Sequence, residues 1–140
     1  MRAKQLFILP AVVFLMAACQ ATPALAQSNY QMSLTWPIQG ALVTTGSMVS
    51  VSGSITVSNG APAPVGVQAT VDGYVGTGGV WQVPGAANTY YFNVAVYVPP
   101  DAPTGLAQDV FAKGSATGNG RDWGTAGAAH TTVNVEKPGH

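Results

Sequence analysis

Apolar and polar residues alternate along most of the chain after residue 29. The cleanest example is residues 48–57, where hydroxyl side chains face one way and apolar side chains the other, the apolar ones being Val49, Val51, Ile55 and Val57. Alternation at every second residue places side chains on opposite faces of a β-strand, whereas a helix would scatter them around its circumference. The pattern therefore predicts strands with one buried face.

The longest alternating run covers residues 90–98 and ends in a proline-rich corner. Pro99, Pro100 and Pro103 cannot donate a backbone hydrogen bond, so strand pairing must stop there. Further strands are predicted over residues 30–36, 65–72, 80–83, 106–116 and 131–135. An additional edge segment over 38–45 stays open, and residues 74–79 are too rich in glycine to assign.

The alternation also predicts which way two large apolar side chains point. Trp36 continues the alternation of Tyr30, Met32 and Leu34, so we expect it in the core. In the strand after the corner, Leu106 is expected on the same buried side as two later residues, Val110 and Ala112.

The number and spacing of these segments indicate the fold class. No segment combines an apolar helical period with capping residues, so almost no helix is expected after the leader. About seven strands at intervals of roughly ten to fifteen residues predict an all-β protein, an antiparallel β-sandwich. An open barrel and a jelly roll are alternatives, but both usually need about eight strands. We expect a single domain over residues 27–140.

The first 26 residues have the features of an N-terminal signal peptide helix. Arg2 and Lys4 precede an apolar run over residues 6–18, and Ala24 to Ala26 form a cleavage site of small residues. The run is too short to span a bilayer comfortably, which disfavours the alternative of a retained anchor. Residues 16–19 resemble the bacterial lipobox, which would make Cys19 the lipid-modified first residue. On either interpretation the domain has no disulfide, because Cys19 is the chain's one cysteine.

Charged residues are sparse and scattered. The domain after the leader has three basic residues against five acidic ones: Lys113, Arg121 and Lys137, with Asp72, Asp101, Asp109, Asp122 and Glu136. No basic stripe exists, so nucleic acid is not an expected partner. Low charge combined with high apolar content also argues against disorder.

Candidate catalytic and metal-binding residues are few. His130 and His140 lack metal-site spacing, so no metal or cofactor is expected, although a calcium site of scattered carboxylates stays open. His130 with Asp122 and a hydroxyl, or Asp101 with Asp109 as a glycosidase pair, are alternatives to the interpretation of these residues as surface groups. Because no complete catalytic constellation is evident, we expect no enzymatic activity.

The loop over residues 118–124 is the best candidate binding site. Trp123 lies among Asn119, Arg121 and Asp122, so its ring could stack on a sugar or a partner while polar neighbours donate and accept hydrogen bonds. In the alternative that we favour, Trp123 folds back and caps one end of the sandwich.

The corner Val98-Pro-Pro-Asp-Ala-Pro-Thr-Gly105 resembles a recurrent corner of bacterial immunoglobulin-like and fibronectin type III-like domains. The resemblance extends over residues 90–135 and departs where Leu106 and Ala107 replace an expected tyrosine. It implies that the sandwich is an immunoglobulin-like antiparallel β-sandwich of about seven strands. Domains of this build serve as spacers, adhesion modules, surface subunits or appendages of glycan-active enzymes.

These observations lead to one functional expectation and two alternatives. We expect an exported, non-catalytic structural or protein-interaction module of the bacterial periplasm or cell surface. Its partner would be an unknown protein or glycan of the envelope, and it would meet the membrane only through a lipid anchor at Cys19. The alternatives are a small glycan- or peptide-binding domain that uses the Trp123 loop, and a subunit of a surface fibre, which would need an unpaired sheet edge.

Overall fold

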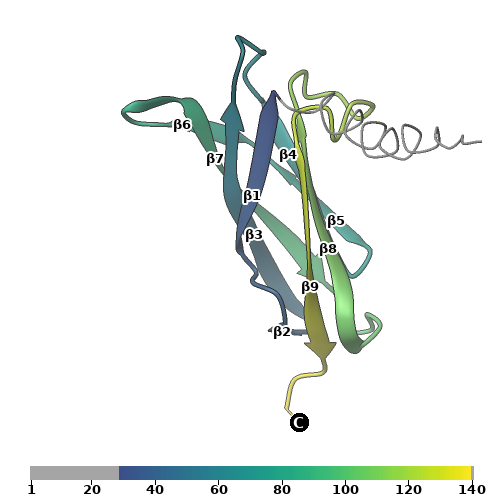
Figure 1. The fold of residues 1–140 in the computed structure, drawn as a ribbon. Helices are drawn as coiled ribbons and strands as arrows, with labels where there is room; N and C mark the ends of the chain where they lie inside the picture. The colour runs from purple at the N-terminus through teal and green to yellow at the C-terminus, as the bar shows by residue number, and fades with distance from the viewer. Residues whose placement is uncertain (1–28, 140) are drawn as a thin grey trace, which may run out of the picture.

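The computed structural model describes residues 29–139, and this part of the chain is all-β (Figure 1). It contains nine strands and no helix: β1 (Tyr30–Trp36), β2 (Ala41–Thr44), β3 (Ser47–Val57), β4 (Gly66–Val71), β5 (Tyr74–Gly78), β6 (Val80–Val83), β7 (Ala86–Val98), β8 (Gly105–Ser115) and β9 (Ala128–Glu136). No described helix is therefore available to span a membrane. The predicted signal peptide, its cleavage site, Cys19 and His140 lie outside the described residues.

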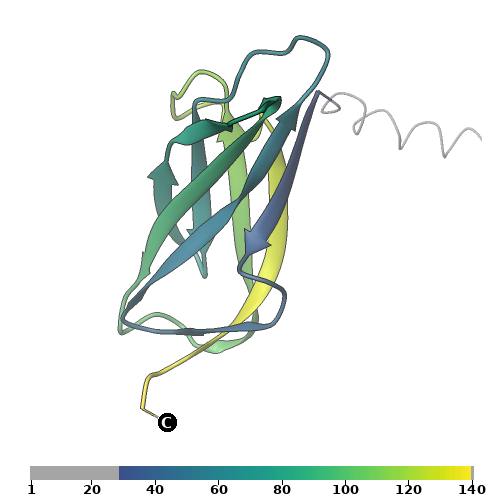
Figure 2. The same cartoon turned by 90° about the vertical axis from the view of Figure 1, so that its left-hand side faces the viewer.

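The strands form two sheets packed face to face. Sheet A has the order β1-β3-β7-β6, and sheet B has the order β2-β9-β8-β4-β5. Figure 2 shows sheet A in front, with its strands running obliquely to those of the sheet behind. In the seven-strand immunoglobulin fold, one sheet contains the first, second, fifth and fourth strands in that order, and the other contains the third, sixth and seventh. If β2 and β5 are counted as additions, the remaining strands of sheets A and B are distributed in this way, which confirms the predicted fold class.

Both sheets contribute to the core through the faces that the alternation predicts. In β3 and β7 the buried side chains occupy every second position, and Phe92 is the largest of them. The core also contains Val67, Val110 and Val133 from sheet B, each with no exposed surface. The buried positions of β3, of β7 from Phe92 onward, and of these three residues of sheet B were therefore correctly assigned from the sequence.

Two strands appear beyond the predicted seven. β2 pairs in parallel with β9, through Ala41 opposite Val133 up to Thr44 opposite Glu136, so sheet B is mixed rather than purely antiparallel. β5 is glycine-rich because its backbone passes close to β7: a Cβ on Gly76 would lie 2.3 Å from the carbonyl oxygen of Ala95. Glycine inside a strand commonly marks such a close approach.

The prediction that Trp36 lies in the core is wrong. The register of β1 against β3 shifts between Leu34 and Trp36, so that Trp36 lies opposite Ser52, and its side chain is 45% exposed. A β-bulge adds one residue to a strand and reverses which side chains point inward beyond it. Trp36 consequently shares the outward face of sheet A with Ser52.

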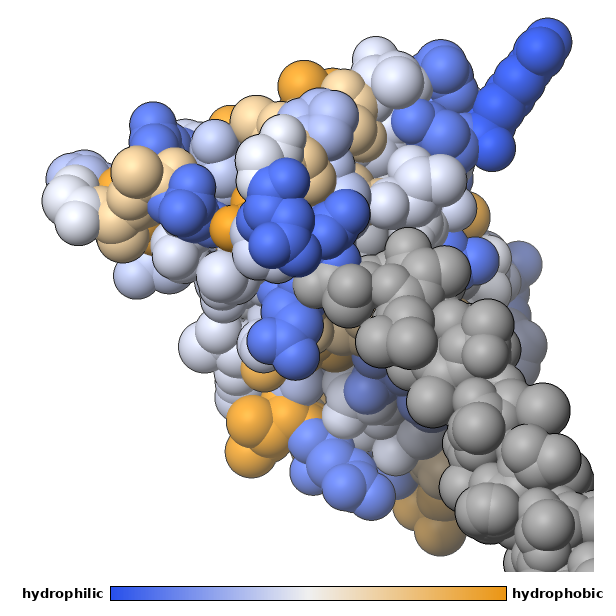
Figure 3. Space-filling view, turned by 45° about the horizontal axis from the view of Figure 1, so that its top comes forward, coloured by the Kyte–Doolittle hydropathy of each residue, from blue (hydrophilic) through white to orange (hydrophobic). Residues whose placement is uncertain are grey.

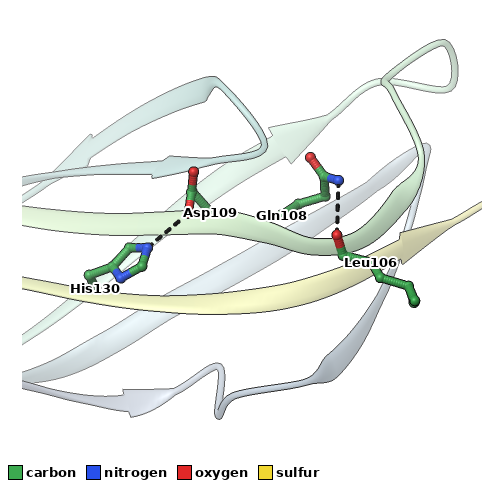
Figure 4. A network of polar contacts seen from close by, with 4 residues as sticks. All are labelled: Leu106, Gln108, Asp109 and His130. Atoms are coloured by element: carbon green, nitrogen blue, oxygen red, sulfur yellow. Dashed lines mark hydrogen bonds and ion pairs between the residues drawn. The ribbon is translucent and has the colours of Figure 1, made fainter.

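The predicted inward orientation of Leu106 is also wrong, for the same reason. The register of β8 against β9 shifts between Gly105 and Gln108, and Ala107 has a positive φ of 56°. Leu106 is left 79% exposed, while the Gln108 side chain donates a hydrogen bond to the Leu106 carbonyl oxygen at 3.2 Å (Figure 4). The alternation resumes correctly at Val110.

Candidate functional site

The predicted binding loop connects β8 to β9 and is held by a buried hydroxyl. Ser115, the last residue of β8, has no exposed surface and accepts hydrogen bonds from the backbone N–H groups of Thr117 and Gly118, at 3.2 and 2.8 Å. Its Oγ in turn donates to Oδ1 of Asp122 at 2.6 Å. Serine at a strand end readily makes such local side-chain to backbone bonds, which compete with continued pairing.

Asp122 therefore serves the loop itself. Its second oxygen, Oδ2, accepts a hydrogen bond from the Thr117 hydroxyl at 2.6 Å, and the Asp122 carbonyl accepts one from the Thr125 hydroxyl at 2.7 Å. The hydrogen bond from Ser115, followed by that from Thr117, holds the pKa of Asp122 below its ordinary value. We call this group the loop latch: Ser115, Thr117 and Asp122.

Asn119 and Arg121 occupy the outer turn of the same loop. The Asn119 Oδ1 accepts a hydrogen bond from the backbone N–H of Arg121 at 2.8 Å, and both residues are exposed. Of the four predicted site residues, Asn119 and Asp122 thus have their side-chain oxygens engaged within the loop. The side chains of Arg121 and Trp123 make no hydrogen bond within the described residues of this loop.

Trp123 lies at the edge of a shallow hollow rather than deep in the core. It is half-buried, and its ring lies close to Gly66, where a Cβ would be 3.6 Å from the Trp123 ring. The hollow has a volume of about 560 Å³, and it is lined by Trp123, Val65, Thr77 and the glycines 66, 78, 79, 118 and 120. Trp123 therefore both packs close to Gly66 of β4 and borders the hollow.

His130 and Asp109 form a pair on the outer face of sheet B. The His130 Nε2 lies 2.9 Å from Asp109 Oδ1 (Figure 4). The His130 ring is also tilted by 31° against the Phe111 ring, with the ring centroids 4.6 Å apart. Asp109 and His130 side chains are 63% and 48% exposed, so solvent screens the pair strongly. His130 is thus partnered by Asp109 and not by Asp122, and no hydroxyl nucleophile is bonded to it among the described contacts.

Metal binding was not expected, and the described residues hold no group of three or more His, Cys, Asp or Glu side chains arranged to bind an ion. Asp101 lies exposed in the corner between β7 and β8, separate from Asp109 within β8. The carboxylates that were considered for a glycosidase pair or a calcium site therefore lie on different elements of sheet B and its loops.

The largest group of exposed aromatic rings was missed by the sequence reasoning. Sheet A carries four of them on its outward side, and we call this surface the aromatic face: Trp36, Trp81, Tyr91 and Tyr97, which are 45%, 51%, 46% and 50% exposed. Trp81 and Tyr91 pair across β6 and β7 with ring centroids 6.3 Å apart and nearly perpendicular planes. The sequence does indicate two of these rings, because Tyr91 and Tyr97 occupy the alternate positions to the buried Phe92 and Val96 and must therefore face outward.

The aromatic face is also uncharged. The four strands of sheet A contain no Asp, Glu, Lys or Arg, whereas Asp109, Lys113 and Glu136 lie in strands of sheet B. Between the rings lie small polar side chains, among them Ser50, Ser52, Ser54 and Asn93. In Figure 3, which brings the loop end of the sandwich forward, the hydrophobic areas form several separate patches between hydrophilic ones.

Comparisons with known proteins give no family. No protein-family model matches the chain. No curated protein matches it either. Solved structures that resemble it include domains 4 and 5 of the S-layer protein SbsC, at 15% identity and a TM-score of 0.41, over 75% of this chain and 44% of that one.

A second similar structure is the CARDB domain of a Pyrococcus furiosus protein, solved in complex with di-metal ions. It shares 12% identity and a TM-score of 0.41, over 78% of this chain and 92% of that one. At these values neither likeness assigns a family or a function, and this chain spans less than half of the S-layer structure.

Proposed function

We propose that this protein is an exported, non-catalytic module of the bacterial periplasm or cell surface that acts by surface contact with an envelope component. The observation that carries the proposal is the aromatic face, with its four exposed rings on one uncharged sheet surface. Exposed tryptophan and tyrosine side chains gathered on one surface are typical of contact sites, because they bury much area at low entropic cost.

The fold supports a contact role by making this surface rigid. Tyr91 and Tyr97 belong to β7, which lies inside sheet A between β3 and β6 and pairs with β3 at ten positions. A surface held in this way loses little conformational freedom on binding, which favours affinity. The leader-like features of residues 1–26 and the scarcity of charge support export, as the sequence predicts.

The test is binding of the processed protein to washed envelope fractions of the producing bacterium, measured by co-sedimentation. We expect the wild type to sediment with the envelope and the double variant Trp36→Ser with Tyr97→Ser to stay in solution. Phe111→Ser is the matched control, because Phe111 is an exposed ring on the opposite sheet and should leave sedimentation unchanged. Equal sedimentation of the double variant and the wild type would refute contact through this face.

A second candidate function is a small glycan- or peptide-binding site at Trp123. The observation that favours it is the glycine-lined hollow beside the half-buried ring. Fluorescence titration with oligosaccharides and short peptides, compared between wild type and Trp123→Phe, tests this site. A ligand response that persists in Trp123→Phe would remove Trp123 from the site.

A further inference from the structure

We propose that the aromatic face binds an uncharged polysaccharide chain, with its rings stacked on successive sugar units. This inference rests on the proposed function, because it names the partner of the same surface. It goes beyond that function in specifying a ligand class and the side chains that would hold it.

The rings are spread along the strands rather than gathered at one point. Tyr91 and Tyr97 are six residues apart on β7, which corresponds to about 20 Å along an extended strand. Trp81 lies opposite Tyr91 at one end of this distance, and Met48 lies opposite Tyr97 at the other. An extended ligand several sugar units long could therefore contact rings at both ends at once.

The middle of the face completes this track. Ser52 of β3 lies opposite Trp36 of β1 on one side and opposite Asn93 of β7 on the other. A row of ring, hydroxyl and amide therefore crosses the sheet between the levels of the two tyrosines. Because the bulge at Trp36 turns that ring outward, β1 contributes an aromatic side chain to a surface on which it would otherwise present only polar ones.

The chemistry of the face matches a neutral sugar polymer. Aromatic rings pack against the C–H faces of sugar rings, and serine and asparagine side chains can donate to and accept from sugar hydroxyls. Sheet A offers no cation to pair with uronate, sulfate or phosphate groups, so a charged polymer would lose hydration without gaining an ion pair. The absence of charge on these strands thus selects a neutral ligand.

A second copy of the chain fits this surface less well. The centre of a stable protein–protein interface is usually depleted in serine. On sheet A, however, Ser50, Ser52 and Ser54 of β3 lie between the rings. A polysaccharide needs no continuous apolar area, because each stacked ring contributes separately.

The experiment measures depletion of the processed protein by insoluble cellulose and chitin, and its affinity for soluble dextran, laminarin and neutral mannan, with polygalacturonate as the acidic comparison. We expect binding to at least one neutral polymer, with little dependence on salt concentration because no ion pair is involved. Trp36→Ala and Tyr97→Ala should each weaken that binding by about tenfold.

Phe111→Ala, an exposed ring variant on sheet B, is the matched control and should bind like the wild type. Trp123→Ala distinguishes this face from the second candidate site, and circular dichroism verifies that every variant folds. Unchanged binding in both Trp36→Ala and Tyr97→Ala, preference for polygalacturonate, or loss of binding in Trp123→Ala would overturn the inference. So would a concentration-dependent dimer that Tyr97→Ala abolishes. If no neutral polymer binds while envelope sedimentation still requires Trp36 and Tyr97, this inference fails and the proposed function stands.

Discussion

Replacing Gly53 by alanine should destabilise the whole domain, because this glycine lets β1 lie close against β3. A Cβ on Gly53 would lie 2.0 Å from the carbonyl oxygen of Ser33 and 2.9 Å from the Cζ of Phe92. Ordinary contact begins near 3.4 Å, so β1 would have to move away by about 1.4 Å. The inner side offers no relief, because Phe92 is only 1% exposed.

The expected cost follows from that displacement. Overpacking a filled core typically costs about 1–3 kcal/mol. A shift of more than 1 Å also stretches the β1–β3 hydrogen bonds beside Gly53, each with a net value of about 0.5–1.5 kcal/mol. We therefore expect a loss of about 2–4 kcal/mol in the free energy of unfolding, which is a large fraction of the stability of a typical domain.

Urea unfolding followed by circular dichroism measures this loss as a lower midpoint. Gly79→Ala is the matched control, because a Cβ there meets nothing within 4 Å and Gly79 does not have a positive φ. Its midpoint should stay unchanged or rise slightly, since alanine restricts the unfolded chain. If the two variants unfolded within about 0.5 kcal/mol of each other, the close approach of β1 to β3 would be wrong.

Four further predictions concern the loop latch, a turn and the core. Ser115→Ala removes the acceptor of two backbone N–H groups and should cost about 1–3 kcal/mol in urea unfolding; an unchanged midpoint would contradict the latch. Because the pKa of Asp122 is lowered, the carboxylate stabilises the folded loop above the ordinary aspartate pKa, and this stabilisation is lost as pH falls through the lower folded value. Amide hydrogen exchange of Gly118 should show this loosening on acidification in the wild type and not in Asp122→Ala. Burial raises the pKa of Asp72, so its ionised form disfavours folding at neutral pH. Asp72→Asn should therefore be more stable than the wild type at neutral pH. Thermal melts should show this difference in stability shrinking at acidic pH, where the Asp72 carboxyl is protonated in both states. Phe92→Ala should cost about 3–5 kcal/mol, whereas Leu106→Ala, at a side chain 79% exposed, should leave the unfolding midpoint unchanged.

The sequence predicts the sandwich because its core strands keep one uninterrupted period. Val51, Val94 and Val96 were assigned to the interior from alternation alone, and each is buried. The prediction failed where one inserted residue reverses the period, at Trp36 and at Leu106. Such a bulge has no signal in the hydrophobic pattern, because the pattern on either side of it remains regular.

The candidate site was predictable only in part. The loop around Trp123 stands out by composition, but the engagement of Asp122 with Ser115 and Thr117 depends on the loop's three-dimensional path. The aromatic face depends on strand order, since β6 and β7 bring Trp81 beside Tyr91 while β1 brings Trp36 across β3. Sequence separation hides such neighbours because the sheet assembles them from distant segments.

The parallel pairing of β2 with β9 has a mechanical consequence. The described chain begins with β1 at one pole of the sandwich, and β9 runs toward the C-terminal end at the other pole (Figure 1). A force pulling these two ends apart is directed along the strands, so the β2–β9 hydrogen bonds from Ala41 to Thr44 are sheared together and share the load. The short β2 segment thus helps the domain resist tension applied at the two ends of its described residues, with β1 loaded in the same way against β3.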